Sequence, residues 1–69
     1  DNRMRLTEFT KAECDKLRDE CNFTPDERAV FDLRSAARSI VEISMTMNIS
    51  ESTVNRRIHA IKKKILKVL

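Results

Sequence analysis

Apolar residues recur along this chain at the three- and four-residue spacings of amphipathic helices. The longest stripe of this kind occupies the last third of the chain and consists of Val54, Ile58, Ile61, Ile65 and Val68. Together with three shorter stripes it predicts four helices, at roughly 10–22, 25–36, 40–47 and 51–68. The shorter stripes supply the other candidate core residues: Cys14, Leu17, Cys21, Ala29, Val30, Leu33, Ala37, Ile40, Ile43, Ser44 and Met47, with Phe9, Phe23 and Phe31 beside them and Met45 as a flexible filler.

Each predicted helix begins at a Ser or Thr that can cap it. Three of these hydroxyls are followed three residues later by Glu, which is the pattern of a capping box. The pairs are Thr10 with Glu13, Thr24 with Glu27, and Ser39 with Glu42. The fourth start is Ser50, where Ile49 and Val54 stand at the positions of a hydrophobic staple. The pattern therefore predicts an all-α fold of four helices.

Composition narrows the class of protein. The 69 residues include no Gly and one Pro, which argues against a turn-rich β protein and against a glycine loop holding a nucleotide phosphate. No apolar run approaches the ~20 residues that a bilayer requires, so we expect no membrane partner. His59 is the only histidine, and no nucleophile–base pair or metal-ligand set is visible. We therefore expect no enzyme, no cofactor and no metal.

The two cysteines lie seven residues apart, at Cys14 and Cys21. On one helix this spacing separates their Cα atoms by ~10 Å, which is too far for a disulfide. Both are predicted to be small core residues in a reducing compartment, which indicates a cytoplasmic protein.

Charge is divided unevenly along the chain. Residues 1–49 hold 8 basic and 10 acidic side chains, whereas residues 50–69 hold 6 basic residues against Glu51 alone. One positive end on a mildly acidic body indicates an anionic partner at that end. The lysines at 62–64 are expected to act as general electrostatic surface.

The third and fourth predicted helices are separated only by Asn48 and Ile49. A short helix, a short turn and a longer basic helix form a helix-turn-helix arrangement. Its turn needs a left-handed residue, and Asn48 is the ordinary substitute for Gly there. We therefore predict a single helix-turn-helix domain over 1–69, with an N-terminal helix at about 10–22 before a core at about 24–66.

About two-thirds of the chain resembles a known pattern. The runs that carry it are Thr24-Pro25-Asp26-Glu27-Arg28, Ser39-Ile40-Val41-Glu42-Ile43-Ser44 and Asn48-Ile49-Ser50-Glu51-Ser52-Thr53-Val54. These runs are similar to the DNA-binding domain of LuxR-type regulators and to region 4 of bacterial sigma factors. The chain departs from the pattern at Ala37 and Asn48, where Gly is usual, and in placing its extra helix before the core.

The resemblance implies sequence-specific binding to double-stranded DNA by a transcriptional regulator or a sigma-like factor. A sigma-like factor would add RNA polymerase as a partner, and a homodimer also remains open. The recognition helix is predicted at about 51–66, in the major groove.

Helical geometry selects the residues that would touch DNA. With Val54, Ile58 and Ile61 turned inward, the outward side of the last helix carries the predicted base contacts Ser52, Asn55, Arg56 and His59. Arg can bond two acceptors of guanine and Asn both edge groups of adenine. The resemblance implies the same role for Asn55, Arg56 and His59, although His59 alone is equally explained as surface. The predicted phosphate contacts are Arg38, Ser39, Ser50, Thr53, Arg57, Lys62 and Lys63.

An alternative from another class is a protein–protein interaction or dimerisation module. The C-terminal cluster Ile65, Leu66, Val68 and Leu69 is more apolar than a frayed helix end requires. Binding to DNA that weakens with salt separates the first hypothesis from the second.

Overall fold

The computed structural model describes residues 5–69, and these form four α-helices and one short 3-10 helix, with no strand among them. In chain order the elements are η1 (Leu6–Glu8), α1 (Lys11–Glu20), α2 (Pro25–Ser35), α3 (Ile40–Met47) and α4 (Glu51–Val68). The predicted all-α fold of four helices is confirmed, and every predicted end lies within two residues of the observed one. The first four residues of the predicted domain lie outside the described residues.

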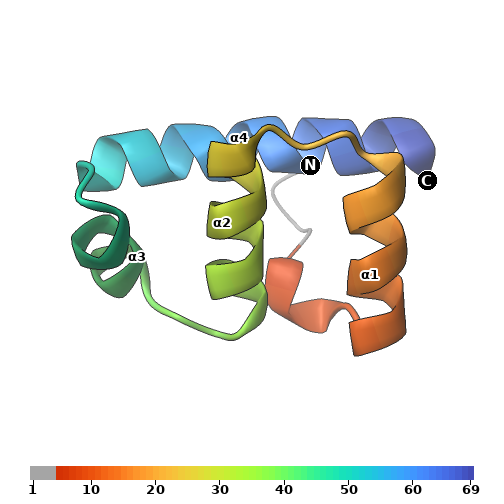
Figure 1. The fold of residues 1–69 in the computed structure, drawn as a ribbon, viewed down its shortest axis with the longest axis horizontal. Helices are drawn as coiled ribbons and strands as arrows, with labels where there is room; N and C mark the ends of the chain where they lie inside the picture. The colour runs from red at the N-terminus through yellow and green to blue at the C-terminus, as the bar shows by residue number, and fades with distance from the viewer. Residues whose placement is uncertain (1–4) are drawn as a thin grey trace.

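The long helix α4 organises the molecule. Figure 1 shows it running from α3 at one end to α1 at the other, with α2 between them and η1 beside α2. The helices α1 and α2 stand side by side and run in opposite directions (Figure 1). All four α-helices therefore surround one core, and the α3–α4 joint lies at the opposite end of the molecule from α1.

All four predicted helix caps are confirmed. The side chains of Thr10, Thr24 and Ser39 each accept the backbone N–H of a Glu three residues later, and that Glu accepts the N–H of the capping residue. Ser50 accepts the Thr53 N–H at 3.1 Å. These bonds satisfy N–H groups that have no partner inside the helix, which is why the helices start where they do.

The core consists mainly of the predicted apolar stripes. Its six fully buried side chains are Val30, Phe31, Ile43, Val54, Ile61 and Ile65. Phe31 packs against Phe23, with 5.1 Å between the ring centroids. In a chain of this length these side chains supply most of the apolar burial that stabilises the fold.

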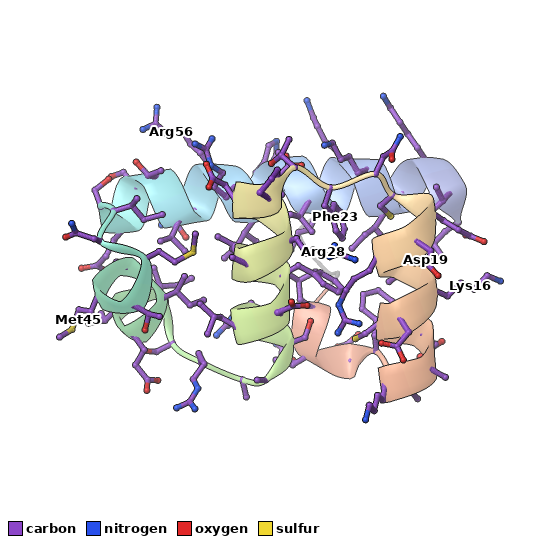
Figure 2. The ribbon with its side chains drawn as sticks, in the orientation of Figure 1. Lys16, Asp19, Phe23, Arg28, Met45 and Arg56 are labelled. Atoms are coloured by element: carbon purple, nitrogen blue, oxygen red, sulfur yellow. The ribbon has the colours of Figure 1, made fainter. Side chains whose placement is uncertain are left out.

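Three predicted core residues are exposed instead. Met45 is 76% exposed and projects from α3 into solvent (Figure 2). It follows the buried Ile43 by two residues, and a rotation of about 200° places it on the opposite side of the helix. Val68 lies in the last turn of α4 and is 38% exposed. Ala37 is exposed because α2 has already ended at Ser35.

The chain makes its tight joints without glycine. Asn22, Ala37 and Asn48 have φ values of 56°, 65° and 56°. Asn48 was predicted to be left-handed, and this is confirmed. The next residue, Ile49, donates its N–H to the Ser44 carbonyl at 3.0 Å, which closes α3 and turns the chain toward α4.

The helix α1 is held to α2 by packing and by one arginine. Its buried face carries Cys14 and Leu17, buried Cys21 follows at its C-terminal end, and both thiols are free. Arg18 donates to Asp32 Oδ1 at 2.6 Å, bonds Asp15, and lies 5.9 Å from the centre of the Phe31 ring. The two carboxylates raise the pKa of Arg18, which keeps this cation charged at every ordinary pH.

Candidate nucleic-acid interface

The candidate interface is the outward face of α4, and the core determines which face that is. Val54 and Ile61 are fully buried and Ile58 packs partly against the same core. Because these residues fix the rotation of the helix, the residues on the opposite side face solvent.

The four predicted base contacts share this outward face. Ser52, Asn55, Arg56 and His59 are all exposed. Figure 2 shows Arg56 projecting away from the bundle, near the α3 end of α4. Their exposure agrees with the predicted orientation of the helix, and contact with a base stays a prediction.

The two hydroxyls at the start of α4 are joined to Arg56. Ser50 Oγ and Thr53 Oγ1 lie 2.9 Å apart, in hydrogen-bond contact. Thr53 Oγ1 also accepts from Arg56 Nη2 at 3.2 Å. This i, i+3 bond was not predicted from the sequence, although the helical spacing of the two residues was a signal that could have found it.

The predicted phosphate contacts fall into two groups. Lys63 is exposed and Lys62 is half-buried, and neither forms an ion pair within residues 5–69. Arg57 Nη2 lies 3.9 Å from Asp26 Oδ2, and Arg38 Nη1 lies 3.6 Å from Glu42 Oε2. Both of these pairs are solvent-exposed and individually weak, so their arginines can exchange a carboxylate for another anion.

The predicted hydroxyl contacts already have structural roles. Ser39 Oγ accepts the Glu42 N–H at 3.1 Å, and Ser50 Oγ caps α4 through the Thr53 N–H while also contacting the Thr53 hydroxyl. Bonds from the backbone N–H and hydroxyl of Ser39 lower the pKa of Glu42, with a smaller effect of Arg38. Only the hydrogens that these bonds leave free are available to a phosphate.

Lys64 does not belong to the general electrostatic surface, so that expectation was wrong. Its Nζ lies 2.5 Å from Glu27 Oε1, and Glu27 is the only charged residue buried in the described part of the chain. Burial raises the pKa of Glu27, but bonds from Lys64 and from the Thr24 N–H outweigh burial and lower it. The pair joins the start of α2 to the C-terminal half of α4 and stabilises the fold that presents the outward face.

Acidic side chains are few on α4 and more frequent on α1. Exposed Asp15, Asp19 and Glu20 lie on α1, whereas Glu51 is the only acidic residue on α4. In Figure 2, Lys16 and Asp19 lie at one end of the molecule and Arg56 lies toward the other. The acidic groups near the α3 end of α4 are Glu51, Glu42, which pairs with Arg38, and Asp26, which pairs with Arg57.

Residues 5–69 contain neither a metal-binding cluster nor a membrane-spanning helix. No group of three or more His, Cys, Asp and Glu side chains is placed to hold a metal ion. No helix there has the length and apolar character needed to cross a bilayer.

Comparisons with known proteins identify no relative of this chain. No family model, curated protein or solved structure matches the chain. The resemblance to LuxR-type and sigma region 4 domains stays a prediction from the motifs quoted above.

Proposed function

We propose that this protein binds double-stranded DNA in a sequence-specific manner, as a helix-turn-helix transcriptional regulator or sigma-like factor. The observation that carries the proposal is the outward face of α4, where Ser52, Asn55, Arg56 and His59 are exposed together on a helix whose only acidic residue is Glu51. An α-helix fits the major groove, and the N-terminal half of such a helix contacts base edges.

The residue types on this face suit base reading. Arg56 offers a planar guanidinium that can bond O6 and N7 of guanine, and Asn55 can bond N6 and N7 of adenine. Lys62, Lys63 and Arg57 lie on or beside the same face and would orient the helix through phosphates. The short α3, joined to α4 through Asn48, would support the helix from one end.

Selection from random duplex DNA, followed by binding titrations at several salt concentrations, tests the proposal. We expect one enriched motif and an affinity that falls steeply with salt, each phosphate contact adding about −0.9 to the log–log slope. Lys63→Ala should weaken binding to all duplexes and reduce the slope by about one unit.

Lys16→Ala is the matched control, since it removes one positive charge from α1 at the far end of the molecule (Figure 2). It should leave the salt slope unchanged. A wild-type protein that enriches no motif would refute the proposal.

The alternative function, a protein–protein interaction module, has fewer exposed apolar residues to support it than the sequence predicted. Ile65 is fully buried, so only Leu66, Val68 and Leu69 of the predicted apolar cluster remain exposed. The same titration separates the two functions, because association through an apolar surface does not weaken as salt rises.

A further inference from the structure

The start of α4 differs chemically from the other three helix starts. At α1, α2 and α3 the third helical residue is Glu13, Glu27 or Glu42, and its carboxylate closes a capping box. At α4 that residue is Thr53, and its hydroxyl contacts Ser50 Oγ on one side and Arg56 Nη2 on the other. The cap of α4 is thus linked to the arginine on the outward face.

We infer that Thr53 is a positioning residue for base recognition: its hydroxyl holds the Arg56 guanidinium in the orientation that reads a base. The inference rests on the proposed function and adds a determinant of specificity to it. It also changes the role predicted for Thr53 from the sequence, which was a contact with phosphate.

The bonding capacity of the hydroxyl supports this role. A hydroxyl has one hydrogen and two lone pairs. Arg56 Nη2 uses one lone pair of Thr53 at 3.2 Å, and the 2.9 Å contact with Ser50 uses a hydrogen from one of the two hydroxyls. Two of the three bonding sites of the Thr53 hydroxyl are therefore occupied within the protein. Where Thr53 donates its hydrogen to Ser50, a phosphate would have to compete with that bond.

The geometry also explains why threonine suits the position. Thr53 is half-buried and β-branched, so its χ1 angle is stiff and its oxygen is fixed relative to the helix. Arg56 is long and exposed, and without an anchor it would sample many rotamers. The contact uses one of its five N–H donors, and four remain for the two bonds that guanine accepts. Anchoring before binding reduces the ordering cost of recognition.

The experiment compares two substitutions at one position. Thr53→Val keeps the branched shape and loses the hydroxyl, whereas Thr53→Ser keeps the hydroxyl. We expect Thr53→Val to reduce discrimination at the base pair read by Arg56 by about threefold to tenfold, with unselected duplex DNA bound as before. Thr53→Ser should retain most of the discrimination. Thr46→Val, at an exposed threonine of α3, is the matched control and should change neither quantity.

A double substitution separates positioning from direct contact. With Arg56→Ala already present, Thr53→Val should cause no further change in preference, because the residue that it positions is gone. If Thr53→Val instead weakens binding to every duplex equally, or leaves the selected motif and its stringency unchanged, the inference is wrong while the proposed function survives.

A measurement without DNA tests the contact directly. In the free protein, NMR relaxation of the Arg56 guanidinium nitrogens should report restricted motion in the wild type and in Thr53→Ser. In Thr53→Val the Arg56 guanidinium should be more mobile. Equal mobility in all three proteins would overturn the inference whatever the DNA result. A wild type that selects no DNA sequence would instead remove the proposed function and the recognition role together.

Discussion

The two halves of α4 hold their basic side chains in different ways. In the N-terminal half, Arg56 points outward and its hydrogen bond goes to the neutral hydroxyl of Thr53. In the C-terminal half, Lys64 turns inward to the buried carboxylate of Glu27. Arg56 therefore presents its charge to solvent, whereas Lys64 uses its charge to hold the helix in place.

This difference shows that neighbouring residues of one type need not share a function. Lys63 and Lys64 are adjacent in the sequence, but a step of about 100° around the helix turns one to solvent and the other to Glu27. Substitutions at Lys64 and at the buried residues of α4 should affect folding first, whereas substitutions at the exposed Arg56 and Lys63 should affect binding without affecting folding.

The largest loss of stability is expected from a core substitution in the C-terminal half of α4. Ile61 is fully buried, and Ile61→Ala should lower the free energy of unfolding by about 2–5 kcal/mol. A domain of this size has only ~0.05–0.15 kcal/mol per residue, so the substitution is expected to unfold much of it. Urea denaturation followed by circular dichroism measures the loss. Leu66→Ala, at a residue that is 46% exposed, is the control. Normal melting of the Ile61 variant would contradict the assigned helix faces.

The adjacent lysines give the sharpest test of the comparison. Lys64→Met leaves the Glu27 carboxylate buried without its cation and should cost about 2–3 kcal/mol, below the value for a fully enclosed pair because Lys64 still reaches water. Lys63→Met should change stability by no more than about 0.5 kcal/mol. Thermal melts of the two variants make the comparison. Equal melting temperatures would show that the Glu27–Lys64 pair contributes nothing.

In the N-terminal half, Arg56→Ala should cost about 1–3 kcal/mol on the selected site and relax preference at one base pair. Arg56→Lys should keep much of the affinity for unselected DNA but lose most of that preference, since an ammonium lacks the planar pair of donors. Arg57→Ala should weaken binding without changing the motif. Repeating the selection with each variant measures these effects. An unchanged motif with both Arg56 variants would move the base-reading role to Asn55 or His59.

Acid should lower the stability of the fold by protonating Glu27, the partner of Lys64. The pKa of Glu27 is lower in the folded protein than its ordinary value of 4.5, so its charged form stabilises the fold. This contribution is complete above about pH 4.5 and is lost as the pH falls through the folded pKa. Glu42 acts with the same sign. Denaturation at a series of pH values should show that Glu27→Gln has a shallower decline than the wild type, and parallel curves would refute this assignment.

The smallest effect is expected at a joint outside both halves. Ala37 has a φ of 65°, a left-handed conformation that costs an ordinary residue about 1–2 kcal/mol. Ala37→Gly should remove this strain while adding backbone freedom to the unfolded chain, for a net gain of about 0.5–1 kcal/mol. Ala36→Gly, at a φ of −83°, should only destabilise. Chemical denaturation compares the two, and a less stable Ala37 variant would contradict the strain.

Local features of the fold were predictable because their signals lie close together in the sequence. A capping box spans three residues and an apolar stripe repeats every three or four, so both could be read directly. The η1 turn spans only three residues, too few to display a stripe. The exposure of Met45 could have been predicted, since it follows Ile43 by two residues and therefore lies on the opposite side of α3.

The candidate site was predictable in outline only. Helical geometry placed Ser52, Asn55, Arg56 and His59 on one exposed face. The Lys64–Glu27 contact joins residues 37 apart, and no local pattern specifies which of three adjacent lysines will meet a buried carboxylate. Tertiary packing decides this, and packing depends on how α2 and α4 cross.

The two buried thiols can report how often α1 separates from the rest of the fold. Cys14 and Cys21 are each 5% exposed, so a thiol reagent in solution reaches them only after α1 has moved away from α2 and α4. Burial also raises the pKa of Cys21, which reduces the reactive thiolate further. The rate of alkylation is therefore governed by the frequency of this local opening. The chain carries two intrinsic probes of its slow fluctuations, and neither requires a label to be introduced.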